Sequence, residues 1–114
     1  MQFTDYDIEC IEKAKSIIDA DISRHYTIEF ISGKTGIGKT KLKKGFKQYY
    51  GISPFTYLRK QRMIKSGKLL LETNKTIKQI AKVVGFGYAT NFTTAFTFYY
   101  GITPNEYRNY FSSK

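Results

Sequence analysis

The strongest constraint on the fold is an internal repeat, because the stretch from Thr76 to Tyr107 has a partial copy upstream in the chain. The segments FKQYYGISPFTY at 46–57 and FTFYYGITPNEY at 96–107 agree at seven of twelve positions, where chance would give about one. Earlier matches keep an offset of 49: Thr27, Ile28, Ile31 and Gly36 pair with Thr76, Ile77, Ile80 and Gly85. The sequence therefore predicts two like modules.

Each copy carries the signals of a short helix, a tight turn at a glycine and a second helix, which are the parts of a helix-turn-helix. No segment alternates clearly enough to be a strand, although 26–31 is ambiguous, so the chain is predicted to be all-α. The expected helices are one starting after Thr4 or Asp5 outside the repeat, Ile28 to about Lys34, Lys39 to Tyr50, Phe55 to Glu72, Ile77 to Val84, about Tyr88 to Tyr100, and a short one ending at Phe111.

The second helix of each copy has an apolar stripe and a polar face on opposite sides. The stripes expected to be buried are Leu42, Phe46 and Tyr49 in the first copy and Phe92, Phe96 and Tyr99 in the second. The polar faces hold Thr40, Lys43, Lys44 and Lys47 in the first copy and Thr90, Thr93, Thr94 and Thr97 in the second. The two faces occupy equivalent positions of the repeat, but the first is positively charged and the second is uncharged.

The net charge of +10 is unevenly distributed along the chain. Up to Asp21 there are six acidic and two basic residues, whereas from Ile22 onward there are three acidic and seventeen basic residues. This balance favours a polyanionic partner. The early acids at 5, 7, 9 and 12 are interpreted as partners of the helix dipole and as solubilising charge.

Composition also limits the possible sites. A single Cys10 and a single His25 exclude an internal disulfide framework and leave no cluster typical of a transition metal. No catalytic constellation is found, so we expect no enzyme, no cofactor and no metal. No run has the length of a membrane span or the profile of a signal peptide, which predicts a cytoplasmic protein without a membrane partner.

The sequence GKTGIGKT from Gly33 to Thr40 satisfies the phosphate-loop pattern at every position. Lys39 would then contact the terminal phosphates and Thr40 a magnesium ion. Magnesium also needs a carboxylate from a second strand, yet the only acids after Thr40 are Glu72 and Glu106. The rest of the chain shows no βαβ alternation, so Gly36 and Gly38 are interpreted as turn and helix-start residues.

The second copy reproduces a family signature in order: Ile77, Ile80-Ala81, Gly85-Phe86, Phe92, Phe96, Tyr100-Gly101-Ile102-Thr103-Pro104 and Tyr107-Arg108. In these residues the chain resembles the DNA-binding domain of the AraC/XylS family of bacterial transcription regulators, over about residues 5 to 111. The resemblance implies seven helices. They would form two helix-turn-helix modules, at about 27–50 and 76–100, joined by a linker helix at about 54–72.

The resemblance also implies double-stranded DNA as the partner, with the second helix of each module as a recognition helix for the major groove. The implied contact residues are Lys39, Thr40, Lys43, Lys44 and Lys47 in the first module and Tyr88, Thr90, Asn91, Thr93, Thr94 and Thr97 in the second. A linker of about 18 residues spans about 27 Å, which suits successive grooves about 34 Å apart. We therefore expect monomeric binding by a transcription activator, with RNA polymerase as a further partner.

Two alternative functions remain open at this point. One is a P-loop nucleotide-binding protein that uses Gly33 to Thr40. The other is a basic protein that binds nucleic acid without reading its sequence, which the charge balance alone would also favour.

Overall fold

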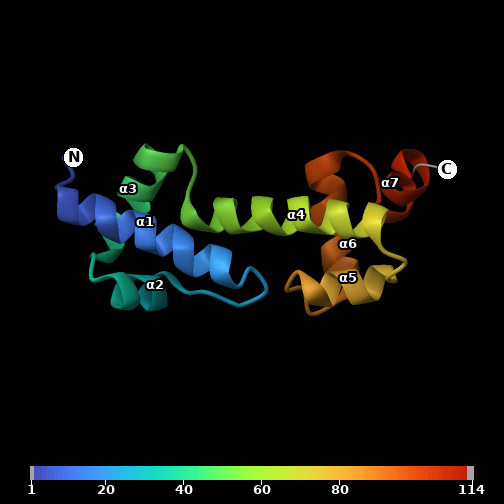
Figure 1. The fold of residues 1–114 in the computed structure, drawn as a ribbon, viewed down its shortest axis with the longest axis horizontal. Helices are drawn as coiled ribbons and strands as arrows, with labels where there is room; N and C mark the ends of the chain where they lie inside the picture. The colour runs from blue at the N-terminus through green and yellow to red at the C-terminus, as the bar shows by residue number, and fades with distance from the viewer. Residues whose placement is uncertain (1, 113–114) are drawn as a thin grey trace. The chain divides into compact units, whose positions relative to one another are not determined.

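Seven α-helices and no strand are found in residues 2–112, the part of the chain that the computed structural model describes (Figure 1). Their bounds are α1 Asp5–Ala20, α2 Ile28–Thr35, α3 Lys39–Tyr50, α4 Pro54–Glu72, α5 Ile77–Val83, α6 Ala89–Tyr100 and α7 Pro104–Phe111. The all-α prediction is confirmed, and the ambiguous stretch 26–31 contains the start of α2. The chain divides after Arg59 into a first and a second compact unit, so α4 begins in one and ends in the other.

In the first unit, α1 packs across α2 and α3 (Figure 1). The apolar residues of α1 follow helical spacing, and Ile11, Ala14 and Ile18 are almost fully buried. The core that they join also contains Ile31, Leu42, Phe46 and Leu58. Burial of these side chains supplies the main stabilising contribution of the unit.

The tandem tyrosines at the ends of α3 and α6 are placed differently from the prediction. Tyr49 was expected in the buried stripe, yet it is 50% exposed, and the Tyr50 ring packs on Phe46 instead, with centroids 4.7 Å apart. The position four residues after a buried side chain continues its stripe, which here is Tyr50 rather than Tyr49. The second unit differs from the prediction in the same way. Tyr99 is 41% exposed, and the Tyr100 ring packs on Phe96 with centroids 4.5 Å apart.

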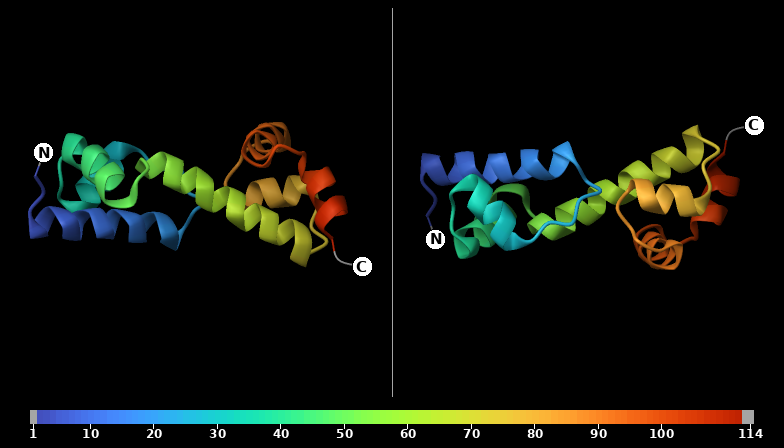
Figure 2. Two further views of the ribbon diagram at one scale, coloured as in Figure 1. Left: turned by 90° about the horizontal axis from the view of Figure 1, so that it is seen from above. Right: turned by 90° about the horizontal axis from the view of Figure 1, so that it is seen from below.

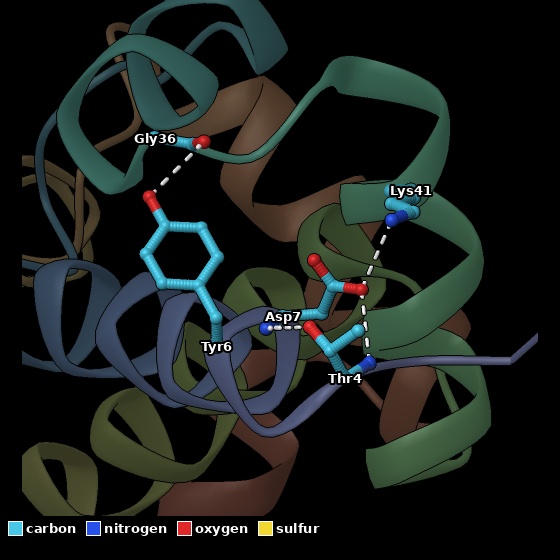
Figure 3. A network of polar contacts seen from close by, with 5 residues as sticks. All are labelled: Thr4, Tyr6, Asp7, Gly36 and Lys41. Atoms are coloured by element: carbon cyan, nitrogen blue, oxygen red, sulfur yellow. Dashed lines mark hydrogen bonds and ion pairs between the residues drawn. The ribbon is translucent and has the colours of Figure 1, made fainter.

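The start of α1 is tied to α3 through one buried carboxylate, shown in Figure 3. Asp7 Oδ2 accepts from the Thr4 backbone N–H at 3.0 Å and from Lys41 Nζ at 3.0 Å. The Thr4 hydroxyl in turn accepts from the Asp7 N–H, which completes a capping box. The Thr4 backbone N–H, followed by Lys41, holds the pKa of Asp7 below its ordinary value.

These contacts of Asp7 predict an acid-sensitive contribution to stability. The pKa of Asp7 is lower in the folded chain than in the unfolded chain, so its contribution is complete above about pH 5 and is lost as the pH falls through the lowered pKa. Urea unfolding of wild type and Asp7→Asn measures it. The difference in unfolding free energy should stay constant above about pH 5 and shrink below about pH 4. A difference that is independent of pH would contradict this role of Asp7.

The second unit contains the C-terminal part of α4 together with α5, α6 and α7. The helix α6 packs against α5 and α7 (Figure 2). Its Phe92 and Phe96 are fully buried. The same core contains Met63, Leu70, Ile80, Ala81 and Val84. Capping boxes at Thr76 and Thr103 fix the starts of α5 and α7.

Close packing explains the glycine in the middle of α4. A Cβ added to Gly67 would lie 3.1 Å from the hydroxyl oxygens of both Tyr100 and Tyr107. The Tyr100 hydroxyl donates to the Met63 carbonyl at 2.9 Å, and burial raises the pKa of Tyr100 to about 12. A side chain at this position would displace the two tyrosine hydroxyls by a few tenths of an ångström, which favours glycine here although glycine is unfavourable in a helix by about 1 kcal/mol relative to Ala.

The C-terminal end of α4 is closed by an arginine from α7. Arg108 donates from Nε to the Leu70 carbonyl at 2.9 Å and from Nη2 to the Thr73 carbonyl at 3.1 Å. Carbonyls at the end of a helix have no intrahelical partners, so a cation in this place satisfies them and matches the helix dipole. Arg108 belongs to the family signature, and its contacts within the second unit explain why an arginine stands there.

Candidate nucleic-acid interface

The first helix-turn-helix is formed by α2, a short turn and α3. Gly36 ends α2 with φ of 85°, a left-handed conformation that glycine adopts without strain. A Cβ there would lie 2.6 Å from the Tyr6 hydroxyl, which is drawn beside Gly36 in Figure 3. From the same helix α1, Cys10 Sγ donates to the Thr35 carbonyl at 3.0 Å. These contacts of α1 fix the turn, and the turn sets the direction of α3.

The segment with the phosphate-loop pattern forms part of this helix-turn-helix. The segment 33–40 covers the last residues of α2, the turn and the first residues of α3, and no residue in 2–112 belongs to a strand. Lys39 Nζ lies 3.4 Å from Glu29 Oε2 in α2. The local sequence therefore forms the turn of a helix-turn-helix, and the nucleotide-binding alternative has no sheet to support it.

The outward face of α3 carries the residues expected to contact DNA in the first module. All five side chains are exposed: Lys39, Thr40, Lys43, Lys44 and Lys47. Leu42 and Phe46 on the opposite side are fully buried, which fixes how α3 is rotated about its axis. The structure thus brings the predicted residues of α3 onto one solvent-facing surface.

The lysines of α3 differ in their carboxylate partners. Lys41 binds Asp7 and Lys39 lies beside Glu29. The backbone N–H of Glu29 and then the Lys39 ammonium hold the pKa of Glu29 below its ordinary value. Within residues 2–112, no carboxylate oxygen lies within 4.0 Å of the other three lysines of the helix, which are Lys43, Lys44 and Lys47. These three are therefore the best placed to attract an external anion.

The second helix-turn-helix is formed by α5, the residues around Gly85 and α6. Gly85 adopts φ of 103°, and the Phe86 N–H donates to the Ala81 carbonyl at 2.8 Å. The Phe86 ring then packs on Phe92 with centroids 5.6 Å apart. This aromatic contact anchors the start of α6 to the core, as α1 anchors the turn of the first module.

The outward face of α6 is uncharged, and only some of the residues predicted to lie on it are exposed. Tyr88 is 73% exposed, and Thr90, Asn91 and Thr94 are also exposed. Thr93 and Thr97 are partly buried, because they directly follow the buried Phe92 and Phe96 around the helix. Lysines at the equivalent positions 43 and 47 of α3 remain exposed because their longer side chains extend into solvent.

A further residue on this face was missed by the sequence analysis. Phe98 is 88% exposed, four residues after Thr94 and therefore on the same side of α6. An aromatic residue in an apolar-rich helix was not distinguishable from core by type alone. The spacing from Phe92 and Phe96, which are fully buried, was the signal that could have placed it outside.

The two units differ in how their charge is placed. The first unit has ten basic and seven acidic residues, and the second has nine basic and two acidic residues. In the second unit, however, no lysine or arginine occurs from Val83 to Tyr107, a range that includes all of α6. The positive charge of the second unit therefore lies outside its recognition helix.

Comparison with known proteins establishes the family. A profile of the helix-turn-helix domain family matches residues 31–110, more than half of the chain. The structure of a transcriptional regulator with an AraC-type DNA-binding domain from Chromobacterium violaceum is 30% identical, with a TM-score of 0.79 over 88% of this chain and 89% of that chain. The chain belongs to the AraC/XylS family. Within this family it is the DNA-binding domain of a bacterial transcription regulator, which is not a class of enzyme.

Two further AraC/XylS relatives match most of the chain. The C-terminal domain of AraT, a response regulator from Geobacillus stearothermophilus, is 32% identical, with a TM-score of 0.87 over 92% of this chain and 88% of that chain. The lactose operon transcription activator of Staphylococcus xylosus is 34% identical over 91% of this chain. The chain spans 37% of the length of that activator.

The described part of the chain has neither a membrane-spanning helix nor a cluster of metal ligands. None of the helices in residues 2–112 has the length and apolar character needed to cross a membrane. The same residues contain no group of three or more His, Cys, Asp or Glu side chains that could hold a metal ion.

Proposed function

We propose that this chain is the DNA-reading part of a longer transcription activator, and that α3 and α6 each enter a major groove of one operator. The observation that carries the proposal is that each unit presents one helix with an exposed outward face, directly after a turn with a glycine at positive φ. An α-helix fits the major groove, where base pairs display distinct patterns of hydrogen-bonding groups. A regulator of this class acts on the chromosome, which places it in the cytoplasm.

The two recognition helices are proposed to have different tasks. Lysines reach phosphate oxygens and guanine edges, so Lys43, Lys44 and Lys47 of α3 supply affinity that depends on salt. Thr90, Asn91 and Thr94 of α6 carry no charge. Threonine methyl groups pack on thymine methyl groups and asparagine bonds adenine edges, so α6 prefers A·T-rich sequence with little dependence on salt.

Monomeric binding follows from two reading helices in one chain. Dimeric regulators place two recognition helices about 34 Å apart by pairing two subunits. Here α4 has 19 residues, which corresponds to about 28 Å of helix and is comparable with that spacing. An asymmetric site of two half-sites is then sufficient, and palindromy is not required. Contact with RNA polymerase is proposed because the Staphylococcus xylosus relative is named an activator.

The experiment that tests this function compares selected with random DNA. Duplexes of about 25 base pairs are first selected from a random library with the purified chain, and binding is then competed with unselected duplex at about 0.15 M salt. A DNA-binding regulator should prefer the selected duplex by about 10³-fold or more. Equal competition by both duplexes would instead support the alternative of a basic protein without sequence readout.

A further inference from the structure

Phe98 is the most exposed of the large apolar side chains in residues 2–112, at 88%. It lies inside α6 rather than at a chain end or in a loop. Phe96 and Tyr100, which lie two residues before and after it, are turned into the core, where their ring centroids are 4.5 Å apart. The core of the second unit is therefore complete without Phe98, and folding gives no reason for a phenylalanine at this position.

The position of Phe98 on the helix connects it to the predicted DNA contacts. At 100° per residue it lies about 40° from Thr94 and about 20° from Asn91, on the side opposite the buried Phe92 and Phe96. Asn91 and Thr94 are themselves exposed. One continuous outward surface therefore contains an amide, a threonine and an unshielded aromatic ring.

The spacing along the axis allows this whole surface to meet one groove. Seven residues separate Asn91 from Phe98, which corresponds to a rise of about 10.5 Å. The major groove of B-DNA is about 12 Å wide. A helix that enters with its N-terminal residues on the bases can therefore still hold the Phe98 ring inside the groove.

The uncharged and aromatic character of this surface indicates which base it would contact. No cation stands between residues 83 and 107, so this stretch of α6 is poorly suited to phosphates. The apolar feature of the major groove is the C5-methyl group of thymine, and phenylalanine is one of the side chains that packs on it. We propose that Phe98 is a specificity-determining residue that packs on thymine methyl groups in the half-site read by α6. This inference rests on the proposed function.

The first unit offers a matched comparison. The repeat places Gln48 of α3 at the position equivalent to Phe98, with the offset of 50 that relates the two copies. Gln48 is exposed as well, but it is polar. The equivalent position in α3 therefore lacks the apolar surface that a thymine methyl group would contact, and substitution there serves as the control.

The test removes the methyl groups without changing base pairing. In the duplex selected with wild-type protein, thymines of each half-site are replaced in turn by deoxyuridine, and dissociation constants are measured for wild type, Phe98→Ala, Phe98→Leu and Gln48→Ala. Wild type should lose about fourfold in affinity at a thymine that contacts Phe98, the value of one buried methyl group. Phe98→Ala should lose less than about 1.5-fold there, whereas Phe98→Leu and Gln48→Ala should keep most of the loss.

The outcomes separate this inference from the proposed function. If wild type binds every deoxyuridine duplex as well as the thymine duplex, or if Phe98→Ala shows the full loss, then Phe98 does not read thymine. A Phe98→Ala variant that binds all duplexes like wild type would assign the ring to a protein partner and would also overturn the inference. In each of these cases, specific binding of wild type to the selected duplex would still support the proposed function.

Discussion

Phe96→Ala is expected to lower the free energy of unfolding of the second unit by about 3 to 5 kcal/mol. Phe96 is fully buried, and its ring lies 5.7 Å from Phe92, 4.5 Å from Tyr100 and 5.3 Å from Tyr107, measured between centroids. Removing it leaves a cavity that three stiff aromatic rings cannot easily fill, in addition to the lost burial. A unit of this size has little stability to lose.

The variant Phe98→Ala is the control for this experiment, because it removes the same side chain two residues later in α6. Its ring is 88% exposed, so the free energy of unfolding should change by less than about 0.5 kcal/mol. Urea unfolding gives the overall change, and hydrogen exchange resolved by segment locates it. Amides of α5 and α6 should exchange faster in Phe96→Ala, while those of α1 and α3 keep their protection. A loss below about 1 kcal/mol for Phe96→Ala would contradict the central place of this ring.

Replacing Lys43, Lys44 and Lys47 together by alanine is expected to weaken DNA binding by about 3 kcal/mol at 0.15 M salt. Each phosphate contact contributes about 0.9 to the slope of log K against log salt, so the slope should fall by about 2.7 if all three contact phosphates. The lysines are exposed and form no ion pair with a described carboxylate. Unfolding therefore cannot account for a loss of affinity, since removing like charges from one helix face does not destabilise it.

Thr94→Ala on the same operator is the matched control for the lysine variant. Thr94 is exposed on α6, and its hydroxyl donates to the Thr90 carbonyl at 3.0 Å. The substitution should leave the salt slope unchanged and relax base preference only in the half-site of α6. If the triple lysine variant retains the wild-type slope, the phosphate role assigned to α3 is wrong. If Thr94→Ala alters no base preference, α6 rests on DNA without reading it at that residue.

Most of the fold could be predicted because its signals are local. Threonine caps at 27, 76 and 103 start α2, α5 and α7, and Gly36, Gly51 and Gly101 end α2, α3 and α6 in left-handed conformations. The helix ends differ from the prediction by about one residue, as at Thr35 and Val83. The repeat added the long-range information, since two copies of one pattern imply two similar packing arrangements.

The parts that could not be predicted depend on tertiary contacts. Asp7 was interpreted as a partner of the helix dipole and as solubilising charge. It does lie in the first turn of α1, but it is 5% exposed and ties α1 to Lys41 of α3. Its position three residues after the Thr4 cap is a local signal of the capping box, whereas its burial depends on Lys41, which is 34 residues away in the sequence. The exposure of Phe98 is different, because its spacing from Phe92 and Phe96 around α6 could have indicated it from the sequence. Whether an aromatic residue faces the core depends on which side of the helix is already occupied.

Substitution with 7-deazapurines tests the proposal that one chain places α3 and α6 in two major grooves of the same operator. Each 7-deaza base removes one N7 acceptor from the major groove and leaves base pairing intact. Scanned through the selected duplex, these bases should weaken binding in two clusters whose centres are about 10 base pairs apart, with native mass spectrometry showing one chain per duplex. A single cluster, or two chains required per duplex, would contradict the account.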